Sequence, residues 1–144
     1  MELEKERASR DYLWGRLLAL AEVTERYSLD KQSAEKRSTN AERLFVRFVE
    51  QPCTTWLNIE LALRPYLDRL AAGDEKAQGI RKRYDRISDE LMSVFKTTGL
   101  DFNSNSRLSG EFLLGYHCQR HALYTKSETP KSPENTEEKE QDND

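Results

Sequence analysis

The residues that could perform chemistry gather near the C-terminal end, where His117, Cys118 and His121 lie close together in the sequence. On a helix, a spacing of four puts both imidazoles on one face, which could supply two ligands of a zinc site. A catalytic zinc site needs a third protein ligand, and Cys53 has no paired ligand beside it. The helical metalloprotease pattern has glutamate directly after the first histidine, where this chain has Cys118. We therefore expect no metal cofactor. A metalloenzyme that uses the two histidines stays a hypothesis ranked below the two that are given at the end of this section.

Nucleophilic catalysis is poorly supported by the same stretch. A histidine can activate a cysteine, but adjacent helical residues point about 100° apart, so only His121 shares a direction with Cys118. No glycine-rich turn frames the pair, and a buried, inert thiol is the common state of a helical cysteine. The chain also has no glycine-rich phosphate loop. The sequence therefore predicts a protein that is not an enzyme.

The charge distribution restricts a nucleic-acid surface to a local patch. The net charge of the 144 residues is −3, with 23 basic and 26 acidic residues. Residues 126–144 carry three lysines and seven acids, which leaves 20 basic and 19 acidic residues elsewhere. No apolar run approaches the roughly 20 residues that span a bilayer. Two cysteines and an N-terminus without an apolar signal core predict a cytoplasmic protein with free thiols.

Hydrophobic periodicity predicts an all-α fold, a single compact bundle of about five helices. We expect these helices at residues 5–27, from 39 or 40 to 52, from 54 or 55 to 72, 74–99, and from 109 onward. Pro65 should bend or split the third helix. The polar residues 28–40 read as a loop. Residues 1–125 form the predicted bundle domain, and residues 126–144 lack large apolar side chains and read as a disordered acidic tail.

Basic side chains cluster on three of the expected helices. In the segment IRKRYDR, three cations fall within an arc of about 100° opposite the apolar stripe, and a fourth flanks that stripe. Arginine suits phosphate because its planar head offers several donors. The candidate nucleic-acid-binding residues are Arg81, Lys82, Arg83 and Arg86, the pair Arg43 and Arg47, and Arg120 and Lys126.

Three stretches carry a family resemblance: DYLWGRLLALAE from Asp11, PCTTWLNIELALRPYLDRL from Pro52, and FLLGYHCQRHALY from Phe112. In this order they resemble the C-terminal helical region of the large subunit of type I-C CRISPR Cascade, which is also made as a separate small subunit. The third stretch is the most specific, because it fits a Phe-x-x-Gly-Tyr-x-x-Gln-Arg pattern. The matching positions are Tyr12, Leu13, Gly15, Arg16 and Leu17, then Pro52 and Trp56, then Phe112, Gly115, Tyr116, Gln119 and Arg120.

The resemblance implies a non-catalytic small subunit of the effector complex. Similar subunits contact the large subunit, the crRNA-bound backbone subunits and further copies of themselves. They help to hold the R-loop, in particular the displaced single-stranded non-target DNA. Base pairing with the guide supplies sequence specificity there, so such a subunit needs no base readout. The alternative is a helical protein–protein adaptor whose arginines serve only partner subunits.

The resemblance also implies packing roles for the shared residues. A glycine inside a helix costs roughly 1 kcal/mol relative to alanine, so a close helix crossing is the expected reason to keep it. That crossing would bring the first helix onto the last. We expect Tyr12, Leu13, Gly15, Leu17, Trp56, Phe112, Gly115 and Tyr116 to pack in the bundle. Arg16 and Gln119 are either buried polar anchors or partner contacts, and the sequence leaves both open.

Overall fold

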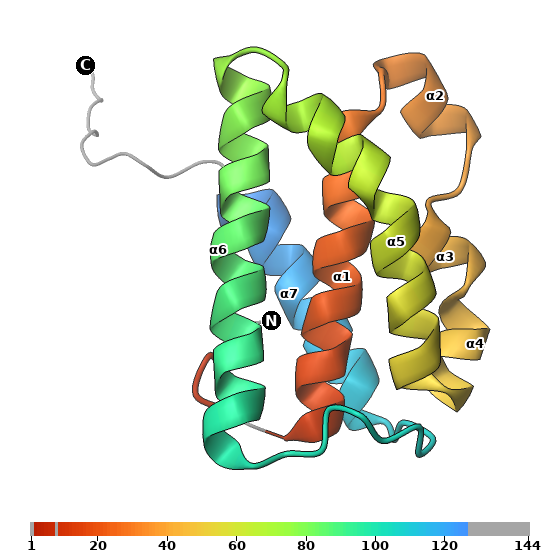
Figure 1. Ribbon diagram of the computed structural model, residues 1–144, viewed down its shortest axis with the longest axis vertical. Coiled ribbons are helices and arrows are strands. Elements are labelled where there is room, and N and C mark those ends of the chain that lie inside the picture. The colour runs from red at the N-terminus through yellow and green to blue at the C-terminus, as the bar shows by residue number, and fades with distance from the viewer. Residues whose placement is uncertain (1, 8, 127–144) are drawn as a thin grey trace, which may run out of the picture.

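The computed structural model describes residues 2–7 and 9–126, and this part of the chain folds into helices without a strand (Figure 1). The predicted all-α bundle is therefore confirmed. The expected acidic tail lies outside the described residues, apart from the backbone of Lys126. The helices are α1 (Arg10–Ser28), α2 (Lys31–Lys36), α3 (Asn40–Arg43), α4 (Phe45–Glu50), α5 (Pro52–Ala71), α6 (Glu75–Thr98) and α7 (Glu111–Lys126).

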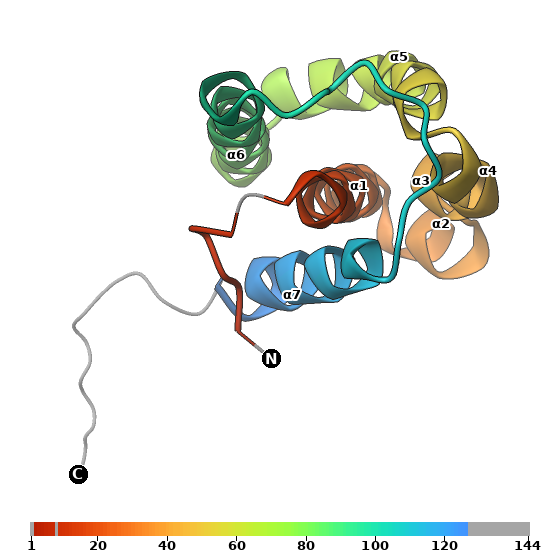
Figure 2. The same cartoon turned by 90° about the horizontal axis from the view of Figure 1, so that it is seen from below.

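Helix α1 forms the centre of the molecule, with the other helices arranged around it (Figure 2). Every residue from Tyr12 to Glu25 is buried, and α7, α6, α5 and α3 all contact this helix. The wide apolar arc in the sequence predicts such packing against several neighbours. The helix begins later than expected, because the Ser9 hydroxyl caps it by accepting a hydrogen bond from the Tyr12 amide at 3.2 Å.

The region between α1 and α5 departs from the predicted loop and single helix. Residues 28–40 contain the short helix α2, which Asp30 caps by accepting from the Ser33 amide at 2.7 Å. The expected second helix is divided at Leu44, whose φ of −101° and ψ of 12° lie outside the helical region. Thr39 does begin this segment, through a capping box with Glu42. The hydrophobic pattern is continuous across Leu44, so the break between α3 and α4 could not be predicted from the sequence.

Helices α5 and α6 run in opposite directions and meet where α5 ends and α6 begins (Figure 1). Helix α5 begins at Pro52, where a proline lacks only an amide that would have no partner, and not at Thr54 or Thr55 as expected. It also continues through Pro65, which is exposed, so the expected split is wrong. Helix α6 matches its prediction: Asp74 caps the start, and Gly99 ends it with a φ of 73°.

The core on the α5 and α6 side of α1 is aromatic. The Trp14 side chain is fully buried, and its ring centroid lies 4.7 Å from that of Phe102 and 5.4 Å from that of Phe95. Trp56 of α5 and Phe48 of α4 pack against the same indole at 6.2 and 5.6 Å. Aromatic contacts of this kind add to the free energy gained from burial.

Helices α1 and α7 approach each other closely at two glycines, one on each helix. A Cβ atom on Gly15 would lie 2.1 Å from the carbonyl oxygen of Phe112, and one on Gly115 would lie 2.1 Å from that of Tyr12. Both neighbours are backbone atoms, so no side-chain movement could make room. This is the close crossing of the first helix on the last that the two glycines predict.

Candidate nucleic-acid interface

Polar side chains that are buried between α1 and α7 fix how the two helices are aligned. The Nε atom of Arg16 donates to Oε1 of Gln119 at 2.7 Å, and both side chains are almost fully buried. The structure therefore places this pair inside the bundle, as buried polar anchors that bond to each other. Burial lowers the pKa of the Arg16 guanidinium, and the carboxylate of Glu90, 3.9 Å away, acts in the opposite direction.

A second buried group lies further along the same contact. The carboxylate of Glu22 is 1% exposed and accepts from the hydroxyl of Tyr116 and, at 3.0 Å, from Nε of Arg120. Burial, together with the hydrogen bond to Glu22, raises the pKa of Tyr116. Arg120 reaches solvent, with its side chain 40% exposed. A buried carboxylate thus orients an arginine at the surface.

The four basic residues of IRKRYDR on α6 do not form one surface. Arg81 turns toward α5, where it donates to the Leu67 carbonyl at 3.1 Å and to Asp85 at 3.1 and 3.2 Å. Arg83 is half-buried and donates to the carbonyl of Leu123 on α7 at 3.2 Å. Both arginines therefore bond to the backbone of another helix, which the sequence does not reveal.

Lys82 and Arg86 are the exposed members of the group. Within the described part of the chain, neither side chain has a hydrogen-bond or ion-pair partner. Arg86 is close enough to Arg83 for its charge to contribute to the lowered pKa of Arg83, which comes mainly from burial. These two cations are therefore available for an external anion.

The pair on the expected second helix is separated by the break at Leu44. Arg43 ends α3 and donates to Oδ1 of Asn40, whereas Arg47 lies on α4 with an exposed side chain. The two no longer have the one-turn spacing of a continuous helix. Lys126 is the last residue of α7, and its side chain lies outside the described residues.

Two tyrosines complete a row of cationic and aromatic groups at the end of α1. The Cζ atom of Arg83 lies 5.7 Å from the ring centroid of Tyr27, and the Tyr27 ring lies 6.0 Å from that of Tyr124. Arg120 follows, with its Cζ atom 5.5 Å from the Tyr124 ring. We call these four residues, from α6, α1 and α7, the arginine–tyrosine row. Tyr27 and Tyr124 are 37% and 36% exposed, so their rings reach the surface.

The two histidines lie on the outer side of α7. His117 and His121 are both exposed, whereas Cys118 between them is buried. The imidazole of His117 makes an edge contact with the Tyr116 ring at 5.0 Å. Over residues 2–7 and 9–126, no group of three or more His, Cys, Asp or Glu side chains is placed to hold a metal ion.

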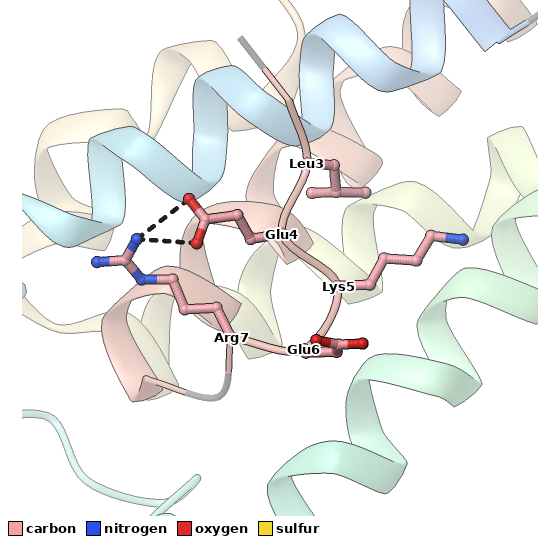
Figure 3. A pocket seen from close by; sticks show the side chains of 5 residues that line it. All are labelled: Leu3, Glu4, Lys5, Glu6 and Arg7. Atoms are coloured by element: carbon pink, nitrogen blue, oxygen red, sulfur yellow. Dashed lines mark hydrogen bonds and ion pairs between the residues drawn. The ribbon is translucent and has the colours of Figure 1, made fainter.

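A hollow of about 600 Å³ lies beside the N-terminal segment (Figure 3). Its lining alternates in charge and comes from one stretch of chain, Leu3, Glu4, Lys5, Glu6 and Arg7. Arg7 also forms ion pairs with Glu4 and with Glu111 of α7. A ligand site usually joins convergent groups from several elements, and this hollow does not.

Comparison with known families identifies the chain. It matches the family described as CRISPR-associated protein (Cas_Csd1) over residues 1–124. The chain belongs to this family. No curated protein matches the sequence. The family match includes the whole arginine–tyrosine row and both glycines of the α1–α7 crossing.

Membership of the Cas_Csd1 family agrees with the type I-C resemblance drawn from the three sequence stretches. The eight residues that we expected to pack in the bundle are all buried, and they lie on α1, α5 and α7. The shared positions thus build the crossing of α1 on α7 and the aromatic core. In residues 2–7 and 9–126, no helix is long and apolar enough to cross a membrane.

Proposed function

We propose that this Cas_Csd1 family member is a non-catalytic small subunit of a type I-C Cascade effector, and that it binds the displaced single-stranded non-target DNA. The observation that supports this most strongly is the arginine–tyrosine row. Two tyrosines at the surface lie between two arginines, and the four residues come from α1, α6 and α7. Single-strand binding without sequence preference uses this combination of cations and stacking surfaces.

The row has the chemistry that a displaced strand requires. Arginine neutralises the phosphates and releases counterions, while a tyrosine face can stack on any base. Lys82 and Arg86 extend the positive surface along α6 beside Arg83. Guide pairing reads the target sequence in such complexes, so the row needs no base-specific hydrogen bonds. The near-neutral body of the protein suits a weak contact that becomes effective inside an assembled complex.

The proposed partners are the large subunit, the crRNA-bound backbone subunits and further copies of this chain. Exposed large apolar side chains support protein contacts: Val46 on α4 is 74% exposed, and Leu57 and Leu61 on α5 are 56% and 67% exposed. Burying such side chains against a partner is favourable. The same observation favours the second candidate function, a protein–protein adaptor without a nucleic-acid contact.

Binding of a fluorescent dT30 oligonucleotide tests the proposal. Arg86→Glu should weaken binding and reduce the slope of log K against log salt by about one, because one phosphate contact is lost. Lys96→Glu is the matched control, since Lys96 lies on the same helix, is exposed and has no partner in the described residues. Both changes alter the net charge equally, so equal effects would contradict a local patch.

A second pair of variants separates the two candidate functions. Tyr124→Ala should weaken binding of dT30 roughly fivefold or more through lost stacking, while Tyr124→Phe should keep it. The adaptor hypothesis predicts no difference between these two variants. Under that hypothesis, dT30 binding is unchanged in both variants, and Leu61→Asp prevents assembly with the other subunits before any target DNA is added.

A further inference from the structure

A further tyrosine that contacts two arginines lies where the end of α2 meets α5: Tyr66 and Arg69 are on α5, and Arg37 caps α2. The Cζ atoms of Arg37 and Arg69 lie 5.2 and 5.3 Å from the ring centroid of Tyr66. Arg37 also donates to the Tyr66 hydroxyl at 2.6 Å. Both arginines are exposed, and Tyr66 is half-buried. We call these three residues the Tyr66 cluster.

The charges of the Tyr66 cluster are only partly compensated. Arg37 is ion-paired with Glu25, whose side chain is 2% exposed, and this pair holds the guanidinium in place. Arg69 has no hydrogen-bond or ion-pair partner in the described part of the chain. Lys36, which precedes Arg37 in the sequence, is exposed and also unpaired there. The guanidinium of Arg69 therefore keeps its donors for an external acceptor.

The position of the Tyr66 cluster relates it to the arginine–tyrosine row. Arg37 follows the last residue of α2, and Arg69 lies in the last turn of α5. Figure 1 shows that these helix ends lie at the same end of the bundle as the end of α1, which carries Tyr27, and the start of α6. A strand that crosses this end of the bundle could contact both sites.

We propose that the Tyr66 cluster is a second binding site for single-stranded nucleic acid, in which Arg69 binds a phosphate and the Tyr66 ring stacks on a base. The anchored Arg37 supplies the second cation. The inference rests on the proposed function, because it extends the path of the same strand beyond the arginine–tyrosine row. An extended path predicts a longer occluded site, and both sites should add to the salt dependence of binding.

The test measures binding of fluorescent dT20 to the full chain. We expect Arg69→Glu to weaken binding about tenfold and to lower the salt slope by about one. Arg64→Glu is the control, because Arg64 is also exposed on α5 and unpaired within the described residues. Tyr66→Ala should weaken binding roughly fivefold or more, and Tyr66→Phe should not, because it retains the ring. Thermal unfolding checks that each variant remains folded.

The outcomes separate this inference from the proposed function. If Arg86→Glu weakens dT20 binding and Arg69→Glu has no larger effect than Arg64→Glu, the second site is wrong and the first stands. If the combined Arg69→Glu and Arg86→Glu effects on the free energy of binding add, the two sites are independent contacts on one strand. If dT20 does not bind, or if a phosphopeptide binds at Arg69 in its place, the inference is overturned.

Discussion

The two sides of α1 pack against their neighbours through different kinds of interaction. Toward α5 and α6, α1 presents Trp14, which packs into a cluster of large aromatic rings. Toward α7 it presents Gly15, which allows backbone contact, and buried polar groups that pair across the helices. Aromatic packing depends mainly on filling volume and tolerates substitutions of similar size. The glycine crossing and the buried hydrogen bonds permit one alignment of α1 with α7.

This difference matters for function because the arginine–tyrosine row spans the α1–α7 contact. Tyr27 is on α1, while Tyr124 and Arg120 are on α7, so their spacing depends on the alignment of these helices. The Glu22 carboxylate orients Arg120 from inside the same contact. Substitutions in the aromatic cluster should therefore lower the free energy of unfolding. Substitutions in the α1–α7 contact should also change the spacing of the arginine–tyrosine row.

Replacing Trp14 in the aromatic cluster should change the free energy of unfolding the most. Trp14→Ala removes a fully buried indole and should lower the free energy of unfolding by about 4 kcal/mol. Trp14→Phe should cost much less, because it keeps a ring and removes the indole N–H, which has no acceptor in the described residues. Urea unfolding measures both, and equal losses would show that volume does not dominate here.

Adding a single methyl group at Gly115 should disrupt the contact between α1 and α7. Gly115→Ala places a Cβ against the Tyr12 backbone, so α1 and α7 must separate, at a cost of roughly 3 kcal/mol. Gly79→Ala on α6 is the control, since a Cβ there meets nothing within 4 Å. The control should gain about 0.5–1 kcal/mol from helix propensity. A stabilising Gly115→Ala would refute the close crossing.

A smaller effect tests the buried polar contacts. Glu22→Gln keeps an acceptor for the Tyr116 hydroxyl but leaves Arg120 without its charged partner, and should cost about 1–2 kcal/mol. A double-mutant cycle of Glu22→Ala with Tyr116→Phe, in which each change removes their hydrogen bond, should give a coupling energy above about 0.5 kcal/mol. Strictly additive losses would mean that the two side chains do not act as a unit.

The smallest effect is a pH dependence on the α6 side. Burial raises the pKa of Tyr84 to about 12, above its usual value near 10, so the folded state holds this proton more tightly. The resulting stabilisation is complete below pH 10 and is lost as pH rises toward 12. Urea unfolding at pH 9 and pH 11 should show a loss larger by about 1 kcal/mol in the wild type than in Tyr84→Phe. Identical losses in the wild type and in Tyr84→Phe would contradict the raised pKa of Tyr84.

The long helices could be predicted because periodicity and caps agree in them. Helix α6 shows both a capping Asp74 and a terminal Gly99 around an apolar stripe. The short helices α2, α3 and α4 were not predicted as such, because they depend on local side-chain caps and on Leu44 leaving the helical region within a continuous apolar pattern. Pro65 did not divide α5, because its missing amide and the freed carbonyl lie on an exposed side.

The candidate site was only partly visible in the sequence. Composition located the cations, but it could not show that Arg81 bonds to α5 or that Arg83 bonds to α7. The spacing of four between Arg120 and Tyr124 is a local signal for their contact. Tyr27 has no such signal, because it meets Tyr124 only after α1 and α7 cross. Sites assembled from distant helices need the tertiary structure.

Photocrosslinking in the assembled effector tests directly whether the arginine–tyrosine row contacts the displaced strand. A benzophenone amino acid at position 124 would be irradiated after the guide-loaded complex has opened a target duplex with separately labelled strands. If the row is a nucleic-acid interface, residue 124 should crosslink to the displaced non-target strand, and the crosslink should be lost when the guide does not match the target. Crosslinks to protein subunits alone, in the presence of a complete R-loop, would contradict the arginine–tyrosine row as a nucleic-acid interface.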